Sequence, residues 1–337
     1  MPSRLVDRRP ELVADDLVSQ LVPPPMFAEV SFAGYVPDPD EPSQAAAVRA
    51  AEQFVAQVGR GRAARHGLFR RRRRPEPGAG LYLDGGFGVG KTHLLASIYH
   101  ACPAPKAFGT FVELTHLVGA LGFANARARL ADYAVLCIDE FELDDPGDTT
   151  MIAGLLTELT EHGVSVAATS NTLPSQLGEG RFAAQDFLRE IKKLADVFAT
   201  VRVDGPDYRH RDLPPAPQPL PEAELIARAE ATPGATLDDF DALCAHLATL
   251  HPSRYKQLVD GVRAVFVDRL HPVADQAVAL RLVVLADRLY DASIPVTVSG
   301  DRLDRIFPQE MLDGGYRKKY LRATSRLLAL SRFAATD

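Results

Sequence analysis

The chain has 337 residues, more than a single hydrophobic core usually serves, so a main domain with a smaller companion is expected. Lys and Arg number 38 against 44 Asp and Glu, and the formal net charge of −6 gives no global reason to expect a nucleic-acid or acidic-membrane partner. With 46% hydrophobic and 24% charged residues, the composition excludes a largely disordered chain.

The N-terminal region is rich in proline, which favours an extended arm with a short helix over a folded domain. Ser43 is predicted to be the N-cap of an alanine-rich helix that reaches Val58. A basic stretch, Arg70 to Arg74, follows the helix. Residues 1–77 are therefore expected to form an N-terminal arm, a helix and a basic linker.

From Gly80 the pattern changes to short apolar runs separated by segments of helix length, which is typical of a parallel sheet with crossover helices. Residues 78–212 are predicted to be an α/β nucleotide-binding core with a five-stranded, mostly parallel sheet. The expected strands are 81–83, about 106–112, 135–138, 164–169 and 198–203.

The last third of the chain begins with a proline-rich segment, residues 213–235, which is predicted to be a linker. Residues 236–337 are expected to form a mainly helical C-terminal lid domain. Within it, 264–267 and 294–298 are predicted strands that flank a helix around 277–290, an added strand–helix–strand unit.

A phosphate-binding pattern follows the first predicted strand. Residues 85–92 fit G-x-x-x-x-G-K-[ST], between an apolar strand and a helix, as this motif requires. Lys91 is expected to reach the β- and γ-phosphates, and the Thr92 hydroxyl to ligate Mg²⁺. The sequence thus predicts an ATP site with the contacts Gly85, Gly86, Phe87, Gly88, Val89, Gly90, Lys91 and Thr92.

Two carboxylates end the apolar strand 134–138. Successive side chains of a strand point to opposite faces, so Asp139 and Glu140 are expected to face differently. Asp139 is predicted to hold Mg²⁺ through water, and Glu140 to polarise the attacking water. The strand 164–169 runs into Asn171, which is predicted to sense the γ-phosphate because ligands of open α/β sheets bind at the carboxyl ends of strands.

These segments together resemble the ZapE family of cell-division ATPases, which also has mitochondrial members. The resemblance covers roughly residues 20–332, and it rests on the P-loop, 137–141, 168–171, 207–209, 240–244 and 282–290. The chain departs from the proteobacterial pattern in a shorter stretch at 110–133 and in the proline-rich segment. The resemblance implies a P-loop AAA+ core with a lid. Because of these departures, it says less about the surfaces that contact partners than about the ATP site.

The same resemblance, with a similarity to initiator-type AAA+ proteins, implies further site residues. Arg181 looks like the arginine finger that completes a neighbouring subunit's site, and Arg326 on the last helix looks like a second sensor. Phe32 and Tyr35 resemble the arm that packs against adenine. The implied function is Mg²⁺-dependent ATP hydrolysis that remodels partner proteins of the division machinery, with self-association bridged by nucleotide.

The runner-up is a nucleic-acid-associated AAA+ ATPase of the helicase-loader type, because clustered arginines such as Arg70 to Arg74 can bind phosphate backbones. The chain lacks a recognisable nucleic-acid module, so a solvated linker is preferred there and nucleic acid is not an expected partner.

Other site classes find no support in the sequence. The three cysteines lack the paired spacing of a zinc site or a disulfide framework and are expected to be reduced thiols. No apolar run approaches the roughly 20 residues of a membrane span, and none forms a signal-peptide core. A soluble, cytoplasmic protein is therefore expected.

Overall fold

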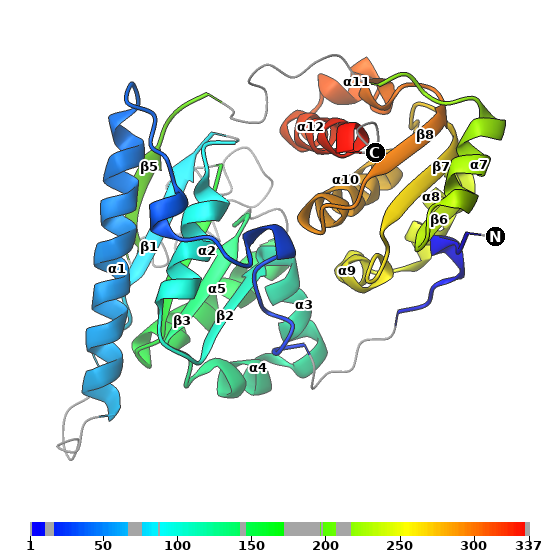
Figure 1. Ribbon diagram of the computed structural model, residues 1–337. Coiled ribbons are helices and arrows are strands. Elements are labelled where there is room, and N and C mark those ends of the chain that lie inside the picture. Colours follow the sequence, from blue (N-terminus) through cyan, green and yellow to red (C-terminus); the bar gives the residue numbers. More distant parts are fainter. Residues whose placement is uncertain are drawn as a thin grey trace. The chain divides into compact units, whose positions relative to one another are not determined.

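A computed structural model describes residues 2–10, 17–66, 76–86, 88–141, 146–171, 196, 198–206 and 217–333. The chain forms two compact units, shown in Figure 1. The P-loop unit comprises Val13–Pro23 and Phe27–Tyr208, and the C-terminal unit comprises Met1–Leu12, Pro24–Met26 and Arg209–Asp337.

The P-loop unit is built on a five-stranded sheet with the order β2-β3-β4-β1-β5. Every pairing in it is parallel, which confirms the predicted α/β core. Because β4 lies between β1 and β3, the loops that follow these strands meet at one edge of the sheet. The strands are β1 Gly80–Gly85, β2 Lys106–Thr110, β3 Val135–Asp139, β4 Ser165–Ser170 and β5 Phe198–Val203.

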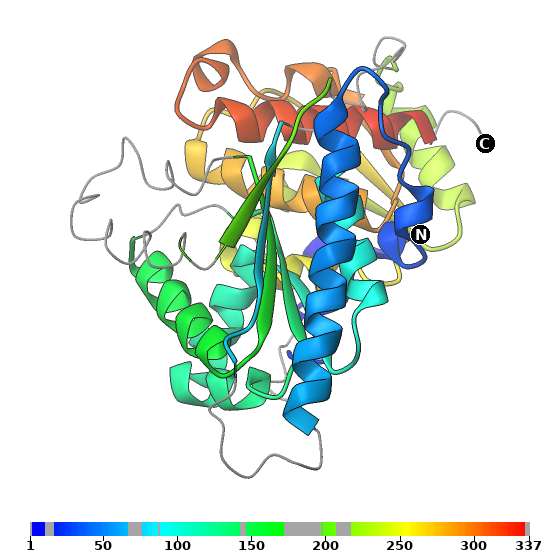
Figure 2. The same cartoon turned by 90° about the vertical axis from the view of Figure 1, so that its left-hand side faces the viewer.

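Helices cover both faces of this sheet. In Figure 2, α1 and α2 lie on one face and α5 lies on the other, and α3 and α4 pack against α5. The helices are α1 Pro42–His66, α2 Lys91–Ala101, α3 Phe111–Leu121, α4 Phe123–Leu130 and α5 Pro146–Glu161.

The helix α1 differs from its prediction at both ends. It begins at Pro42, which suits the first helical position because its missing N–H has no partner there. Ser43 is therefore inside the first turn, and its hydroxyl accepts a hydrogen bond from the Asp204 backbone N–H at 2.9 Å. The helix continues beyond Val58 to His66.

The C-terminal unit contains a second parallel sheet, with the order β6-β7-β8. β7 Ala264–Leu270, α10 Gln276–Asp291 and β8 Val296–Gly300 confirm the predicted strand–helix–strand unit. β6 Ala235–Asp239 adds a strand that was not predicted.

Successive side chains of β7 point to opposite faces of this sheet, and a different core cluster covers each face. Val265 and Val267 belong to one core cluster, with residues of α8 Phe240–Thr249, α10 and α12 Arg317–Phe333. Phe266 belongs to a second cluster, with α7 Glu222–Ala231. Helix α7 lies within residues 213–235, so part of the predicted linker is a packed helix. The short helices α9 Tyr255–Leu258 and α11 Gln309–Leu312 complete the unit.

The first residues of the chain pack on the C-terminal unit rather than on the P-loop unit. Ser3 pairs in parallel with Thr236 of β6, and Leu5, in the turn η1 Leu5–Asp7, is fully buried in the core. Asp238 accepts hydrogen bonds from the backbone N–H of Leu5 at 2.9 Å and of Val6 at 3.1 Å. The predicted N-terminal region 1–77 is thus divided between the two units.

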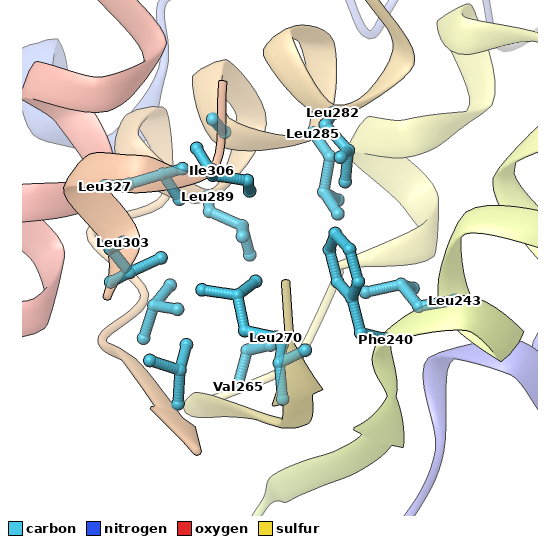
Figure 3. A pocket seen from close by; sticks show the side chains of 14 residues that line it. Phe240, Leu243, Val265, Leu270, Leu282, Leu285, Leu289, Leu303, Ile306 and Leu327 are labelled. Carbon is cyan, nitrogen blue, oxygen red and sulfur yellow. The ribbon is translucent and has the colours of Figure 1, made fainter. Parts of the chain in front are cut away.

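A small cavity lies in the core of the C-terminal unit, between β7, β8 and the helices α8, α10 and α12 (Figure 3). Its volume is about 40 Å³, and all 14 residues that line it are apolar. A cavity without polar partners does not hold an ordered water, so this space belongs to the packing of the core.

Candidate functional site

The P-loop connects β1 to α2 at the carboxyl edge of the first sheet. Gly88 and Gly90 have φ of 66° and 86°, a left-handed conformation that side chains disfavour. At Gly85 a Cβ atom would lie 2.0 Å from the Val203 carbonyl oxygen, so β5 leaves no room for a side chain. Phe87 lies outside the described residues, and the other predicted loop positions take the strand–loop–helix arrangement that the motif requires.

Lys91 is the first residue of α2, and only 9% of it is exposed. Its ammonium group donates to the carbonyl oxygens of Gly85 at 2.8 Å and Gly86 at 2.5 Å. It also donates to Asn171 Oδ1 at 3.0 Å. The predicted γ-phosphate sensor therefore lies beside the P-loop lysine, although the two residues are 80 positions apart.

Thr92 and Asp139 meet at the same edge. The Thr92 hydroxyl donates to the two carboxylate oxygens of Asp139, at 3.2 and 3.1 Å. A hydroxyl and a carboxylate at one point suit Mg²⁺, which takes oxygen ligands and is usually held by one or two protein groups together with water and phosphate oxygens. The residues present thus fit the predicted metal.

Thr169 of β4 connects the two carboxylate residues, a role that sequence reasoning missed. Its hydroxyl donates to Asp139 Oδ1 at 2.5 Å and accepts the backbone N–H of Glu140 at 3.1 Å. Glu140 has a φ of 53°, which is unusual for a residue other than glycine. The register of the two strands explains this contact, because Ile138 pairs with Ala168 and the next residues along the strands are Asp139 and Thr169.

A second buried carboxylate, Asp84, precedes the P-loop at the end of β1 and was also missed. It is 1% exposed and pairs with Arg202 of β5 at 2.6 Å. Arg202 also binds Asp204 at 2.7 Å, and Gln44 of α1 donates to the Asp204 carbonyl at 2.9 Å. The start of the P-loop is thus tied to β5 and α1. A charged residue inside an otherwise apolar strand was the available signal.

The predicted arm residues lie in the P-loop unit. Phe32 and Tyr35 are half-buried and pack against its core. Tyr35 also donates its hydroxyl to the Val89 carbonyl at 2.7 Å, which brings the arm directly onto the P-loop.

The two predicted arginines have different outcomes. Arg181 lies outside the described residues. Arg326 lies on α12 of the C-terminal unit, where it pairs with Asp287 of α10 and has its guanidinium carbon 5.3 Å from the centre of the Tyr290 ring. Arg322 binds the same Asp287 carboxylate at 2.9 Å. Asp287 is thus shared by two guanidinium groups.

The cysteines are free thiols, as predicted. Burial raises the pKa of Cys102 and of Cys244 to about 12, and it raises the pKa of Cys137 well above its ordinary value. Burial therefore disfavours the thiolate, the form in which a cysteine acts as a nucleophile. Within the described residues, no helix is both long enough and apolar enough to cross a membrane.

Comparison with known sequences places these features in a family. The chain matches the AFG1-like ATPase family over residues 13–230 and 216–335. It is 35% identical over 150 residues to the cell division protein ZapE of Escherichia coli K12, across 41% of this chain and 40% of that protein. It is 27% identical over 166 residues to the lactation elevated protein 1 homolog B of Danio rerio, across 42% of this chain and 33% of that protein. Each match spans less than half of the relative's length.

Among solved structures, the crystal structure of DnaI aligns with a TM-score of 0.41 at 19% identity, over 57% of this chain and 98% of its own. Domain III of the replication initiation protein DnaA from Thermotoga maritima aligns with a TM-score of 0.37 at 21% identity, over 54% and 69%. The family match covers most of the chain and both structural units. The protein belongs to the AFG1-like ATPase family.

Proposed function

We propose that this protein hydrolyses ATP with Mg²⁺ and uses the reaction to remodel partner proteins. The observation that carries the proposal is the convergence of Lys91, Thr92, Asp139 and Asn171 at one edge of the first sheet. These groups come from three separate segments, and together they supply a cation for phosphate, two metal ligands and a polar sensor.

Each residue has a distinct role in the proposed reaction. Lys91 binds the β- and γ-phosphates, which replace carbonyl oxygens as partners of its ammonium group. Mg²⁺ bound at Thr92 and Asp139 would supply Lewis-acid stabilisation of phosphate charge. Glu140 accepts a proton from the attacking water, and Asn171 contacts the γ-phosphate. Arg181 from a neighbouring subunit and Arg326 from the lid complete the proposed set, and Phe32 and Tyr35 belong to an arm proposed to contact adenine.

The proposed partner belongs to the division machinery and is a division-ring component in a bacterial cytoplasm, because the Escherichia coli relative is named a cell division protein. Nucleotide-bridged self-association is part of the same proposal, since a finger residue such as Arg181 acts on another subunit's site. Turnover assays with and without candidate polymers identify the partner, because a polymer that the protein remodels should change the rate of ATP hydrolysis.

The P-loop assignment is tested with Lys91→Ala and Glu140→Gln. Lys91→Ala removes a charge-assisted phosphate contact, so MgATP binding should be lost. Glu140→Gln keeps the shape but removes the carboxylate, so binding should persist while turnover falls by about 10² or more. Affinity by calorimetry and phosphate release measure the two effects.

Lys106→Ala is the matched control. Lys106 donates to two backbone carbonyl oxygens, those of His100 at 3.0 Å and Cys102 at 3.1 Å, much as Lys91 does, but it lies on β2. Its removal should leave MgATP affinity unchanged. Unchanged affinity in folded Lys91→Ala would remove the P-loop assignment, and wild-type turnover in Glu140→Gln would mean that another residue is the base.

A further inference from the structure

Tyr35 contacts the P-loop from the arm that precedes α1. Its hydroxyl donates to the Val89 carbonyl at 2.7 Å. A Cβ atom at Gly90 would lie 2.4 Å from Cε2 of the Tyr35 ring, so the ring rests directly against the glycine backbone. One side chain of the arm therefore touches the two loop residues that immediately precede Lys91.

The arm is itself anchored on the first turn of α2. His93 Nε2 lies 3.0 Å from the Ser31 carbonyl oxygen, and because a carbonyl can only accept, Nε2 carries the hydrogen. The His93 and Tyr35 rings meet edge to face with their centres 5.7 Å apart. The turn η3 Phe32–Gly34 is closed by the Gly34 N–H, which donates to Ser31 at 3.0 Å. His93, which follows Thr92 in α2, thus helps to fix the position of Tyr35.

The hydroxyl contact sets the orientation of one peptide group. The Val89–Gly90 peptide is trans, so its C=O and N–H groups point in opposite directions. Tyr35 takes the carbonyl on the side of the arm and leaves the Gly90 N–H on the other side of the loop. A P-loop binds phosphate through backbone N–H groups that face inward, and the Tyr35 hydroxyl gives the Val89 carbonyl a partner that does not belong to the loop.

We infer that Tyr35 is a positioning residue for the phosphate groups of the nucleotide, and that it acts through its hydroxyl on the Val89–Gly90 peptide. This role differs from the adenine contact that the family resemblance implies, because stacking needs the ring and does not need the hydroxyl. The inference rests on the proposed function, since it concerns how this loop binds ATP.

Tyr35→Phe and Tyr35→Leu separate the two roles. Both are made in the Glu140→Gln background, which prevents turnover during titration, and their affinities for MgATP and for Mg-tripolyphosphate are measured by calorimetry. Tyr35→Phe should weaken the binding of both ligands by about tenfold, since one hydrogen bond at the loop is lost. An equal loss for the ligand without adenine identifies a phosphate effect.

Tyr255→Phe is the matched control, because Tyr255 donates its hydroxyl to the Leu247 carbonyl at 2.9 Å in the C-terminal unit. It should leave both affinities within about twofold of the parent. The inference is overturned if Tyr35→Phe binds both ligands as the parent does, if only Tyr35→Leu loses affinity, or if Tyr255→Phe loses as much. If the parent itself binds no MgATP, the proposed function fails first, so the two failures are distinct.

Discussion

At the scale of single residues, Thr169 determines how two carboxylate residues are placed. Its hydroxyl donates to Asp139 and accepts the Glu140 N–H, so one side chain on β4 orders both the proposed metal ligand and the proposed base. Groups that orient metal ligands typically affect metal affinity or activity by about 10- to 100-fold when they are removed.

Thr169→Val keeps the shape of the side chain and removes both hydrogen bonds. We expect turnover to fall by roughly 10- to 100-fold and the Mg²⁺ concentration for half-maximal turnover to rise. Thr169→Ser should restore much of the activity, because it returns the hydroxyl. Phosphate release during a Mg²⁺ titration measures both quantities.

Thr157→Val is the control for this prediction. Thr157 donates to the Ala153 carbonyl within α5, a helix that contains neither proposed metal ligand, and its removal should leave turnover and Mg²⁺ dependence unchanged. Wild-type Mg²⁺ dependence in Thr169→Val would show that Asp139 is positioned without this hydroxyl.

At the scale of elements, the N-terminal segment is held on α8 by a contact that depends on protonation. Arg9 donates to His246 Nδ1 at 2.7 Å, and a nitrogen that accepts from a guanidinium group must be unprotonated. Burial, and then the charge of Arg9, lower the pKa of His246. Folding therefore favours the neutral ring.

The free energy of unfolding should fall as the pH drops below about 6.5, because the unfolded chain then binds a proton that the folded chain resists. Above that pH the contribution is fully present. His246→Asn replaces Nδ1 with an oxygen that accepts from Arg9 without titrating. Urea unfolding of both proteins between pH 5 and 8 should show a steeper loss for the wild type on the acid side.

His271 supplies a control with the opposite sign. Its pKa is raised by the Pro272 carbonyl and by Asp241, so its contribution to stability is present at low pH and is lost as the pH rises through its raised pKa. His271→Asn should thus change the pH profile in the other direction. Identical profiles for the wild type and His246→Asn would contradict the proposed neutral state of His246.

At the scale of the whole molecule, the proposal is that ATP bound to one subunit is hydrolysed with the help of Arg181 from a neighbouring subunit. Arg181→Ala should leave ATP affinity nearly intact and lower turnover by roughly 10² or more, because an arginine finger stabilises charge in the transition state. Mixing Arg181→Ala with Glu140→Gln should restore partial turnover, since each variant supplies the group that the other lacks.

Sedimentation of Glu140→Gln with MgATP should show nucleotide-dependent assembly, because a ligand at an interface stabilises the assembled state by mass action. Normal turnover of Arg181→Ala would make Arg189 the next candidate. If the two variants assemble together and no mixture regains activity, the proposal that Arg181 acts on a neighbouring subunit's ATP loses its main support.

The cytoplasmic location stays a prediction.

The sequence by itself determined the elements and motifs that depend on neighbours along the chain. The P-loop pattern places Lys91 and Thr92 between a strand and a helix, and the apolar run before Asp139 predicts its place at a strand end. Glycine spacing and apolar runs are local properties, so they can be read without knowing which segments pack together. The order of the strands then made the contact between Lys91 and Asn171 possible.

Only the tertiary structure decided which distant segments meet. β6 has two carboxylates in five residues, and its strand conformation depends on pairing with β7 and with Ser3. Leu5 binds Asp238 across 233 positions, and Tyr35 binds Val89 across 54. Ordering such segments costs conformational entropy, which is offset only by contacts with the partner surface. No pattern of neighbouring residues shows where that surface is. The division of the N-terminal region between two units and the position of Tyr35 on the P-loop therefore follow from packing, which one-dimensional spacing does not encode.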